Sequence, residues 1–444
     1  DSQKDAKTSL ANAKSGKTDG TTETATTDGG SSVGVAAALA LNVSNSVADV
    51  SVDNVAINGD LTLAASNNMD AKAEADGSAS VGDGAGVGVA VAINVADMDN
   101  LAVLGSGATV NGGFTASATM KDVGGDTSHD FAALATSGAS ASDVGVAGSF
   151  GLNIVDSDTV AALEGAVNAG AEAVSLTAAS TSASDVEGKA NASGNTGVGA
   201  SFAINVVDSL SRAEVADGAV LSGGSDLTLS ATGSHDATTT ATAGGEAPDG
   251  TGVGGAIAIS VIDSLTEARV GTGGDLMLSG AFSASAAHHG ATTTTADGTA
   301  LGADAAIGAA IALGFVDDIA ESDLDRNASA ASVSLTAAAD GASTVTAKAS
   351  ATGEDSGAAS DSDSQKDAKT SLANAKSGKT DGATETATTD GGSSVGVAAA
   401  LALNVSNSVA DASVDNVAIN GDLTLAASNN MDAKAEADGS QADG

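Results

Sequence analysis

The stretch that decides the fold is GVGASFAINVVDS at residues 197–209, because close variants of it recur along the whole chain. The variants lie at residues 33–43, 86–95, 144–157, 252–264 and 306–318. Aligned on the asparagine of this phrase, the anchor positions are Asn42, Asn94, Asn153, Asn205, Ser260, Gly314 and Asn404, with steps of 52, 59, 52, 55, 54 and 90 residues. Steps of this size are typical of solenoids, propellers and repeat arrays.

A second, longer repeat contains the first. Residues 1–78 return almost unchanged as residues 363–440 at a constant offset of 362, and only Thr21 and Val50 differ, becoming Ala383 and Ala412. The six short steps add up to this offset, so the long repeat holds six modules, one of which carries an insertion. An enzyme needs one site with unique neighbours, whereas a polymer of repeated units has a use for near-verbatim copies.

The predicted organisation follows from these two periods. Polar, Lys-bearing insertions are expected at 1–30 and 339–392, and the next long repeat starts at 393–444. The six modules are expected at 31–82, 83–141, 142–193, 194–248, 249–302 and 303–338. Since the sequence starts and ends inside a repeat, we expect it to be part of a longer chain.

The anchor phrase alternates with a period of two. Phe202, Ile204 and Val206 are large, and the residues between them, Ala203 and Asn205, are small or polar. This pattern predicts a β-strand. An apolar residue returns about ten positions later and indicates a second strand, at Val52, Leu104, Leu163, Val215, Val270 and Leu324. A third strand is expected at phrases such as GDLTLAAS (59–66) and a fourth in Ala/Thr stretches such as 237–245, with Gly-rich turns between them.

We therefore predict an all-β fold, a β-solenoid (β-helix) of tandem ~52-residue modules within the 362-residue repeat. The equivalent Leu, Ile and Val residues should form ladders down its interior, and the small-residue face (Ala40, Ala92, Gly151, Ala203) should let coils or filaments pack closely. Each module fits two turns of the coil, so one long repeat has about a dozen rungs and a length of roughly 60 Å. The alternative is a string of small β-sandwich modules, against which stand the lack of Pro-rich linkers and of aromatic anchors.

The amino-acid composition disfavours several classes of partner and of chemistry. The formal net charge is −41, from 57 acidic and 16 basic residues, which disfavours nucleic acid and anionic membrane surfaces as partners. Cysteine, Trp and Tyr are absent and only three arginines are present, so thiol chemistry and a sugar-cleaving cleft are not expected. The longest apolar run, at 33–43, is far shorter than the roughly 20 residues of a membrane-spanning helix.

A row of acids shortly after the anchor is the candidate metal site: Asp97, Asp99, Asp156, Asp158, Asp208, Asp263, Asp317 and Asp318. Stacked carboxylates repel one another unless water or a cation intervenes, and Ca²⁺ suits adjacent acidic pairs. The competing interpretation is that Asp ends the strand with a side-chain turn. No catalytic or other cofactor-binding residues are predicted.

Three other features have structural interpretations. The anchor asparagines should bond to one another along the coil axis. The histidines His129, His235, His288 and His289 are expected in surface loops. The Lys-bearing insertions (Lys4, Lys7, Lys14, Lys17 and their copies) are either flexible excursions or basic patches that dock on an acidic face. Thr runs at 238–240 and 292–295 are similar to ice-binding ladders but are not expected to recur in every module.

The phrases GVGASFAINVVDS, GVGVAVAINV and GGSDLTLSATG resemble the repeat regions of giant filamentous bacterial adhesins, the filamentous-haemagglutinin-like and leukotoxin-like surface proteins. The resemblance implies a fibrous, extracellular β-solenoid at the cell surface. We therefore expect a structural protein and not an enzyme, a rigid filament or sheath whose partners are copies of itself and other cells or surfaces. The alternatives are a monomeric adhesin stalk with a distal binding tip and a calcium-dependent surface layer.

Overall fold

The computed structural model describes residues 33–352 and 395–439, and these residues form 22 β-strands that pair mainly in parallel, with no helix among them. The strands are β1 (Val33–Val52), β2 (Ala56–Asn58), β3 (Leu61–Asn67), β4 (Asp70–Asp76), β5 (Ala79–Ser80), β6 (Ala85–Leu104), β7 (Thr109–Asn111), β8 (Phe114–Met120), β9 (His129–Ser140), β10 (Val144–Leu163), β11 (Ala166–Gly170), β12 (Val174–Ser193), β13 (Thr196–Val215), β14 (Val220–Gly223), β15 (Leu227–Ala247), β16 (Thr251–Val270), β17 (Leu276–Met277), β18 (Ala281–Gly302), β19 (Ala305–Leu324), β20 (Ala328–Thr352), β21 (Val395–Val414) and β22 (Ile419–Asp438). The predicted all-β class is confirmed.

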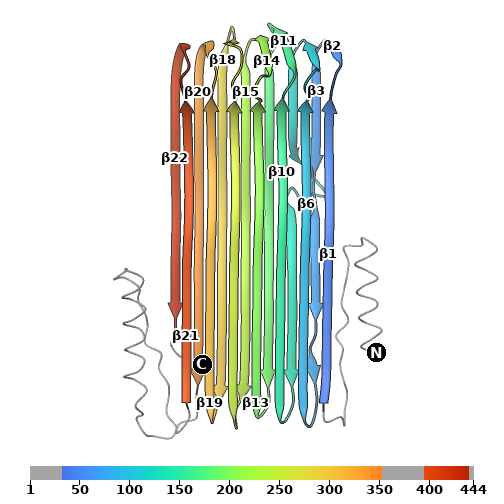
Figure 1. Cartoon of the computed structure of the whole chain (residues 1–444), viewed down its shortest axis with the longest axis vertical. Coiled ribbons are helices and arrows are strands. Elements are labelled where there is room, and N and C mark those ends of the chain that lie inside the picture. The colour runs from blue at the N-terminus through green and yellow to red at the C-terminus, as the bar shows by residue number, and fades with distance from the viewer. Residues whose placement is uncertain (1–32, 353–394, 440–444) are drawn as a thin grey trace, which may run out of the picture.

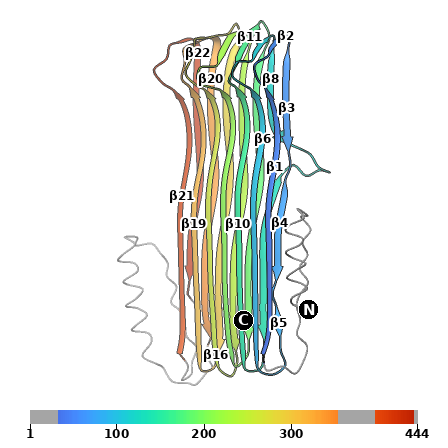
Figure 2. The ribbon, with the colours of Figure 1, turned by 45° about the vertical axis from the view of Figure 1, so that its right-hand side comes forward.

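Two large sheets form the two layers of the molecule (Figures 1 and 2). The sheet that we call the anchor sheet has the strand order β1-β6-β10-β13-β16-β19-β21, and each of its strands has 20 residues. The sheet that we call the return sheet includes β3, β8, β12, β15, β18 and β20. A small end sheet, β14-β11-β7-β2, lies at one end of the long strands. At about 3.3 Å per residue the anchor strands are roughly 65 Å long.

Each module makes one turn and not two. In module 4 the chain runs along β13, crosses the end sheet through β14 and comes back along β15 before β16 opens the next module. The expected first and second strands are one continuous strand, because no turn residues interrupt the alternation, as between Asn205 and Val215. The expected third and fourth strands are continuous in module 4, as β15, but are separate in module 1, as β3 and β4, and in module 2, as β8 and β9. Seven anchor strands at about 4.8 Å span about 30 Å, half the predicted length.

Successive modules pair in register. All 20 residues of β13 face the equivalent residues of β16, and the Asp208–Asp263 and Val215–Val270 pairs show the constant offset. Strands of different modules thus share continuous sheets, so the alternative of separately closed sandwiches does not describe residues 33–352 and 395–439. This in-register stacking is consistent with a β-solenoid-like class of all-β protein.

The boundary of the second insertion was predicted too early. β20 runs on to Thr352, so residues 339–352 belong to the return sheet, paired with β18 and β22. The remainder of that insertion and the insertion at 1–30 lie outside the described residues.

The inside and the outside of the anchor sheet are reversed relative to the prediction. The small side chains face the return sheet, and Ala92, Ala203, Ala258 and Ala312 are completely buried. The large residues of the anchor phrase point outward and are partly exposed, among them Leu39, Leu41, Val43, Ile154, Phe202, Val261 and Phe315. Large buried side chains gather instead near the end sheet, where Leu104, Leu163, Val215, Val270 and Leu324 pack against Phe114 and Phe282.

The reason for the reversal is the closeness of the two sheets. A Cβ added at Gly254 would overlap the backbone carbonyl oxygen of Thr299 on the return sheet, and one at Gly199 would overlap that of Gly244. No side chain fits at these two positions, and neighbouring inward positions such as Ala203, Ala256 and Ala258 hold only a methyl group, because interiors are packed at close to crystal density. The larger members of the alternating pattern are therefore excluded from this half of the interior.

Substitutions at two adjacent glycines of β16, Gly254 and Gly255, can test how closely the two sheets approach each other. Gly254→Ala should destabilise the protein by at least about 2 kcal/mol, because its methyl group forces the sheets apart. Gly255→Ala is the matched control, since no atom lies within 4 Å of a Cβ at that position. Chemical denaturation would measure both free energies of unfolding. Equal stability of the two variants would contradict the close approach of the sheets.

Candidate functional site

The predicted acidic row is a real column, but it lies in the middle of strands. Asp97, Asp156, Asp208, Asp263 and Asp317 occupy equivalent positions on five neighbouring anchor strands. They alternate with inward-facing residues and therefore lie on the outer face of the anchor sheet. The interpretation that these residues end their strands is wrong, because each strand continues for seven more residues.

The column is electrostatically strained. Burial, followed by the carboxylates of Asp263 and Asp156, raises the pKa of Asp208 above the usual aspartate value. At the two ends of the column, amides relieve the charge: Asn45 Nδ2 donates to Asp97 Oδ2 over 2.9 Å, and Asn407 Nδ2 donates to Asp317 Oδ1 over 2.8 Å.

A shorter second column lies two residues further along. Asp99 and Asp158 are paired across β6 and β10. Burial and then the neighbouring carboxylates raise the pKa of each of these two side chains. Neither pair proposed for Ca²⁺ belongs to a tight group of three potential metal ligands in the described part of the chain.

The asparagine ladder is confirmed. Asn42 donates to Asn94, and Asn94 to Asn153, each over 2.8 Å, and Asn153 donates to Asn205 over 3.3 Å. Asn404 bonds to Ser343 instead, since its neighbour on β19 is Gly314. These amides stabilise the stack along its axis.

Three of the four histidines are buried, which corrects the expectation of surface loops. His129, His235 and His288 lie inside strands of the return sheet and face the interior, and only His289 is exposed, beside Asp340. The burial of these histidines could have been predicted from the alternation of inward and outward residues along each strand. In β15, His235 has the same parity as the buried Leu227 and Leu229.

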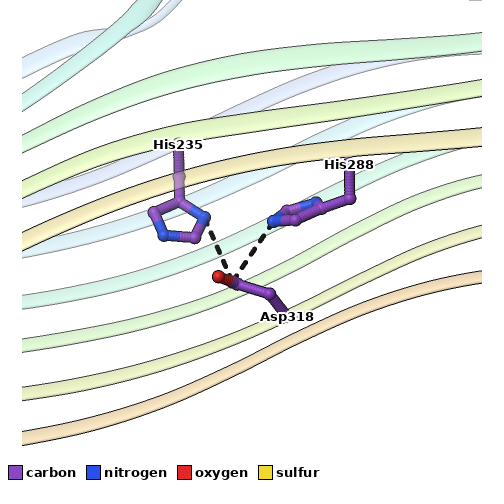
Figure 3. Close-up of side chains that lie close together, drawn as sticks. All are labelled: His235, His288 and Asp318. Atoms are coloured by element: carbon purple, nitrogen blue, oxygen red, sulfur yellow. Dashed lines mark hydrogen bonds and ion pairs between the residues drawn. The ribbon is translucent and has the colours of Figure 1, made fainter. Parts of the chain in front are cut away.

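Two of these histidines meet Asp318, the one member of the acidic row that points inward (Figure 3). His288 Nε2 lies 3.2 Å from Asp318 Oδ1, and His235 Nδ1 lies 3.7 Å from the same oxygen. The two imidazole rings are 5.4 Å apart between centroids. His235 comes from β15, His288 from β18 and Asp318 from β19, so the cluster joins three modules and both large sheets.

Hydroxyl groups surround the cluster. Thr266 Oγ1 lies 3.1 Å from His288 Nδ1, and Ser264 Oγ lies 3.2 Å from His235 Nδ1. Thr292 Oγ1 lies 3.4 Å from the other ring nitrogen of His235, Nε2. Ser264 and Thr266 of β16 both face inward, so the anchor sheet supplies polar partners to imidazoles of the return sheet.

Glycines leave room for the rings. Gly290 pairs with His235 and Gly233 pairs with His288 in the β15–β18 ladder. A Cβ at Gly290 would lie 2.5 Å from Asp318 Oδ2 and 2.6 Å from His235 Cε1, and a Cβ at Gly233 would lie 3.1 Å from His288 Nδ1. The sequence therefore provides a small residue beside each buried ring.

Burial keeps two of the histidines neutral. Desolvation lowers the pKa of His129 and of His235 to about 4, against the opposing effect of nearby aspartates. His129 Nδ1 accepts a hydrogen bond from the backbone N–H of Met69 over 2.9 Å. His235 is a neutral imidazole at pH 7, a form that can accept a proton or ligate a metal.

Comparison with protein families, with curated proteins and with solved structures found no match. Within the described residues, no helix has the length and apolar character needed to cross a membrane.

Replacing one carboxylate tests the strain in the acidic column. Asp208→Asn should raise the melting temperature at low salt by removing repulsion, an effect of less than about 1 kcal/mol at this exposed site. The gain should shrink as salt is added. Asp236→Asn is the control, because Asp236 stands between Ala183 and Ala291 in the return sheet. An equal change in both variants would contradict mutual repulsion within the column.

The buried imidazole of His129 predicts a pH dependence. Its pKa is lowered from 6.5 to about 4, so the unfolded chain binds a proton that the folded chain does not, and stability is lost as the pH falls from 6.5 towards 4. The loss attributable to this group is about 3 kcal/mol. His129→Asn, which keeps an acceptor for the Met69 N–H, should flatten this part of the stability profile. An unchanged slope would show that His129 does not titrate in this way.

Proposed function

We propose that this chain is a structural repeat protein, a closed β-solenoid that forms a rigid extracellular filament or sheath. The observation that carries the proposal is that the long repeat resumes the stack. β21, the copy of β1, pairs with β19 over all 20 of its residues in the register used between the other modules. A further copy adds to the same two sheets without any new type of contact.

The interior supports a closed coil. Apolar clusters lie between the anchor and return sheets along the stack, and the end sheet joins them at one end. In-register columns of identical or similar residues give each module the partner that its open edge needs.

The outer face of the anchor sheet is the proposed contact between copies. Three adjacent columns of Leu, Ile, Val and Phe cross all seven strands, and Ile154, Phe202 and Val261 remain 40, 40 and 39% exposed. A contiguous apolar surface of this kind marks an interaction site. The outer face of the return sheet offers a contrast, since it carries polar columns such as Thr240, Thr295 and Thr346.

The partner that fits this face best is a second copy turned by a two-fold axis. When two anchor sheets meet with opposite strand directions and their apolar columns overlap, the aspartate column of one copy lies against the column that contains Ala200, Gly255 and Ala309 in the other. The carboxylates are then well separated, and the small residues leave space for them. A parallel arrangement would place like charges opposite each other.

The remaining features of the proposal rest on the resemblance to filamentous adhesins. These are an extracellular location at a bacterial surface, a structural role without catalysis, and attachment to other cells or surfaces. A calcium-dependent layer is the second candidate, favoured by the outward Asp97–Asp317 column, and a monomeric stalk is the third.

Lateral association can be tested with one substitution on each face. The unmodified chain should dimerise or form thicker fibres as its concentration rises, and Phe202→Lys should abolish this, because a charge then stands within the apolar columns. Thr240→Lys on the return sheet is the matched control and should associate normally. Analytical ultracentrifugation and electron microscopy give the readout. Monomers at every concentration would favour the stalk, and association only with added Ca²⁺ would favour the layer.

A further inference from the structure

We propose that His235, His288 and Asp318 form a binding site for a divalent transition-metal ion, best suited to Zn²⁺. This site is independent of the lateral association described above, because its residues lie between the sheets and not on the outer face. All three side chains are at least 97% buried, at 3% exposure for His235, 2% for His288 and 1% for Asp318.

Two of the three spacings between the ligand atoms are close to those of tetrahedral zinc. Zinc lies about 2.0–2.1 Å from imidazole nitrogen and carboxylate oxygen, so two ligands of a tetrahedral ion are about 3.3 Å apart. The two measured separations from Asp318 Oδ1 are 3.2 Å to His288 Nε2 and 3.7 Å to His235 Nδ1. All three ligand atoms lie within 4.8 Å of one another, so small side-chain shifts close the site around an ion.

The neighbouring hydroxyls favour the ligating tautomers. When an ion takes the place of the 3.2 Å contact between His288 Nε2 and Asp318 Oδ1, Thr266 Oγ1 is placed to accept the Nδ1–H of His288, and Nε2 can bind the ion. Thr292 Oγ1 is placed to accept the Nε2–H of His235, which leaves Nδ1 free. Fixing the tautomer through the second ring nitrogen is the usual way in which proteins orient histidine ligands.

A metal ion would also compensate the charge of the buried Asp318 carboxylate. Asp318 is buried, and its ion-pair partners within the described residues are the two histidines alone. A buried carboxylate is costly unless a positive charge compensates it. A divalent ion bound through one ring nitrogen of each histidine supplies that charge.

The set of donors selects the metal class. Two imidazoles and one carboxylate suit Zn²⁺ and its neighbours in the transition series, whereas Ca²⁺ and Mg²⁺ prefer oxygen ligands throughout. The fourth position can be taken by the Ser264 hydroxyl, 3.2 Å from His235 Nδ1, or by water. Gly290 keeps the space beside Asp318 Oδ2 open.

A bound ion would link three consecutive modules. His235 belongs to β15, His288 to β18 and Asp318 to β19, so the ion crosslinks the return sheet to the anchor sheet and holds the modules in register. Metal binding to the folded state alone stabilises that state by mass action.

The test uses the whole chain, stripped with a chelator and then titrated with Zn²⁺ or Co²⁺. We expect one Zn²⁺ per chain by calorimetry, a higher melting temperature on addition of Zn²⁺ but not of Ca²⁺, and the visible absorption of tetrahedral Co²⁺. Histidine side-chain nitrogen spectra should show ligation through Nδ1 of His235 and Nε2 of His288. Absence of binding, or a spectrum typical of six oxygen ligands, would overturn the proposal.

Variants then locate the ion. Asp318→Asn and His288→Gln should each weaken Zn²⁺ binding at least about 100-fold, and Thr266→Val about 10-fold, through the orientation of His288. Gly290→Ala should also weaken binding, because its methyl group enters the space beside Asp318 and His235. His289→Asn is the matched control: it removes the adjacent, exposed histidine and should bind Zn²⁺ normally. If a ligand variant does not fold, the cobalt and nitrogen spectra of the unmodified chain decide. Unchanged binding in folded Asp318→Asn or His288→Gln, or loss in His289→Asn, would show that the ion binds elsewhere.

Discussion

The close approach of the two large sheets is the constraint on which the rest of the structure depends. Where backbone faces backbone across Gly254 and Thr299, no side chain fits between the layers, and nearby inward positions such as Ala256 hold alanine. Because side chains alternate along a strand, filling the interior with small residues places the large residues outside. The thin core and the apolar outer face of the anchor sheet are thus two results of one packing restriction.

The repeat periods, the all-β class and the amide ladder of Asn42–Asn205 could be predicted because each depends on spacing alone. Alternation shows that a strand has two different faces, but it does not say which face is buried, and the usual preference for buried Leu and Ile gave the wrong choice. The meeting of His235, His288 and Asp318 could not be predicted, since it depends on how residues of three modules align across two sheets. The burial of the two histidines could have been inferred, because His235 and His288 lie an even number of residues from the buried Leu229 and Phe282 on the same strands.

Contacts along the stack of modules differ in kind from contacts between the two sheets. Along the stack, hydrogen bonds between neighbouring strands and the side-chain amides connect one module to the next. Across the stack, contact between the sheets is apolar at Ala203 and Phe282 but polar at Thr266 and His288. A polar contact in the interior has stricter geometry than an apolar one, so it specifies the alignment of the two sheets more narrowly.

The equivalence of β1 and β21 bears on the length of the stack of modules. These two strands carry the same sequence at 19 of 20 positions, yet one pairs through one edge with β6 and the other through its opposite edge with β19. Within the described residues, the same strand sequence therefore pairs at either edge of the anchor sheet. The length of such a stack depends on the number of modules encoded and on what covers its last edge.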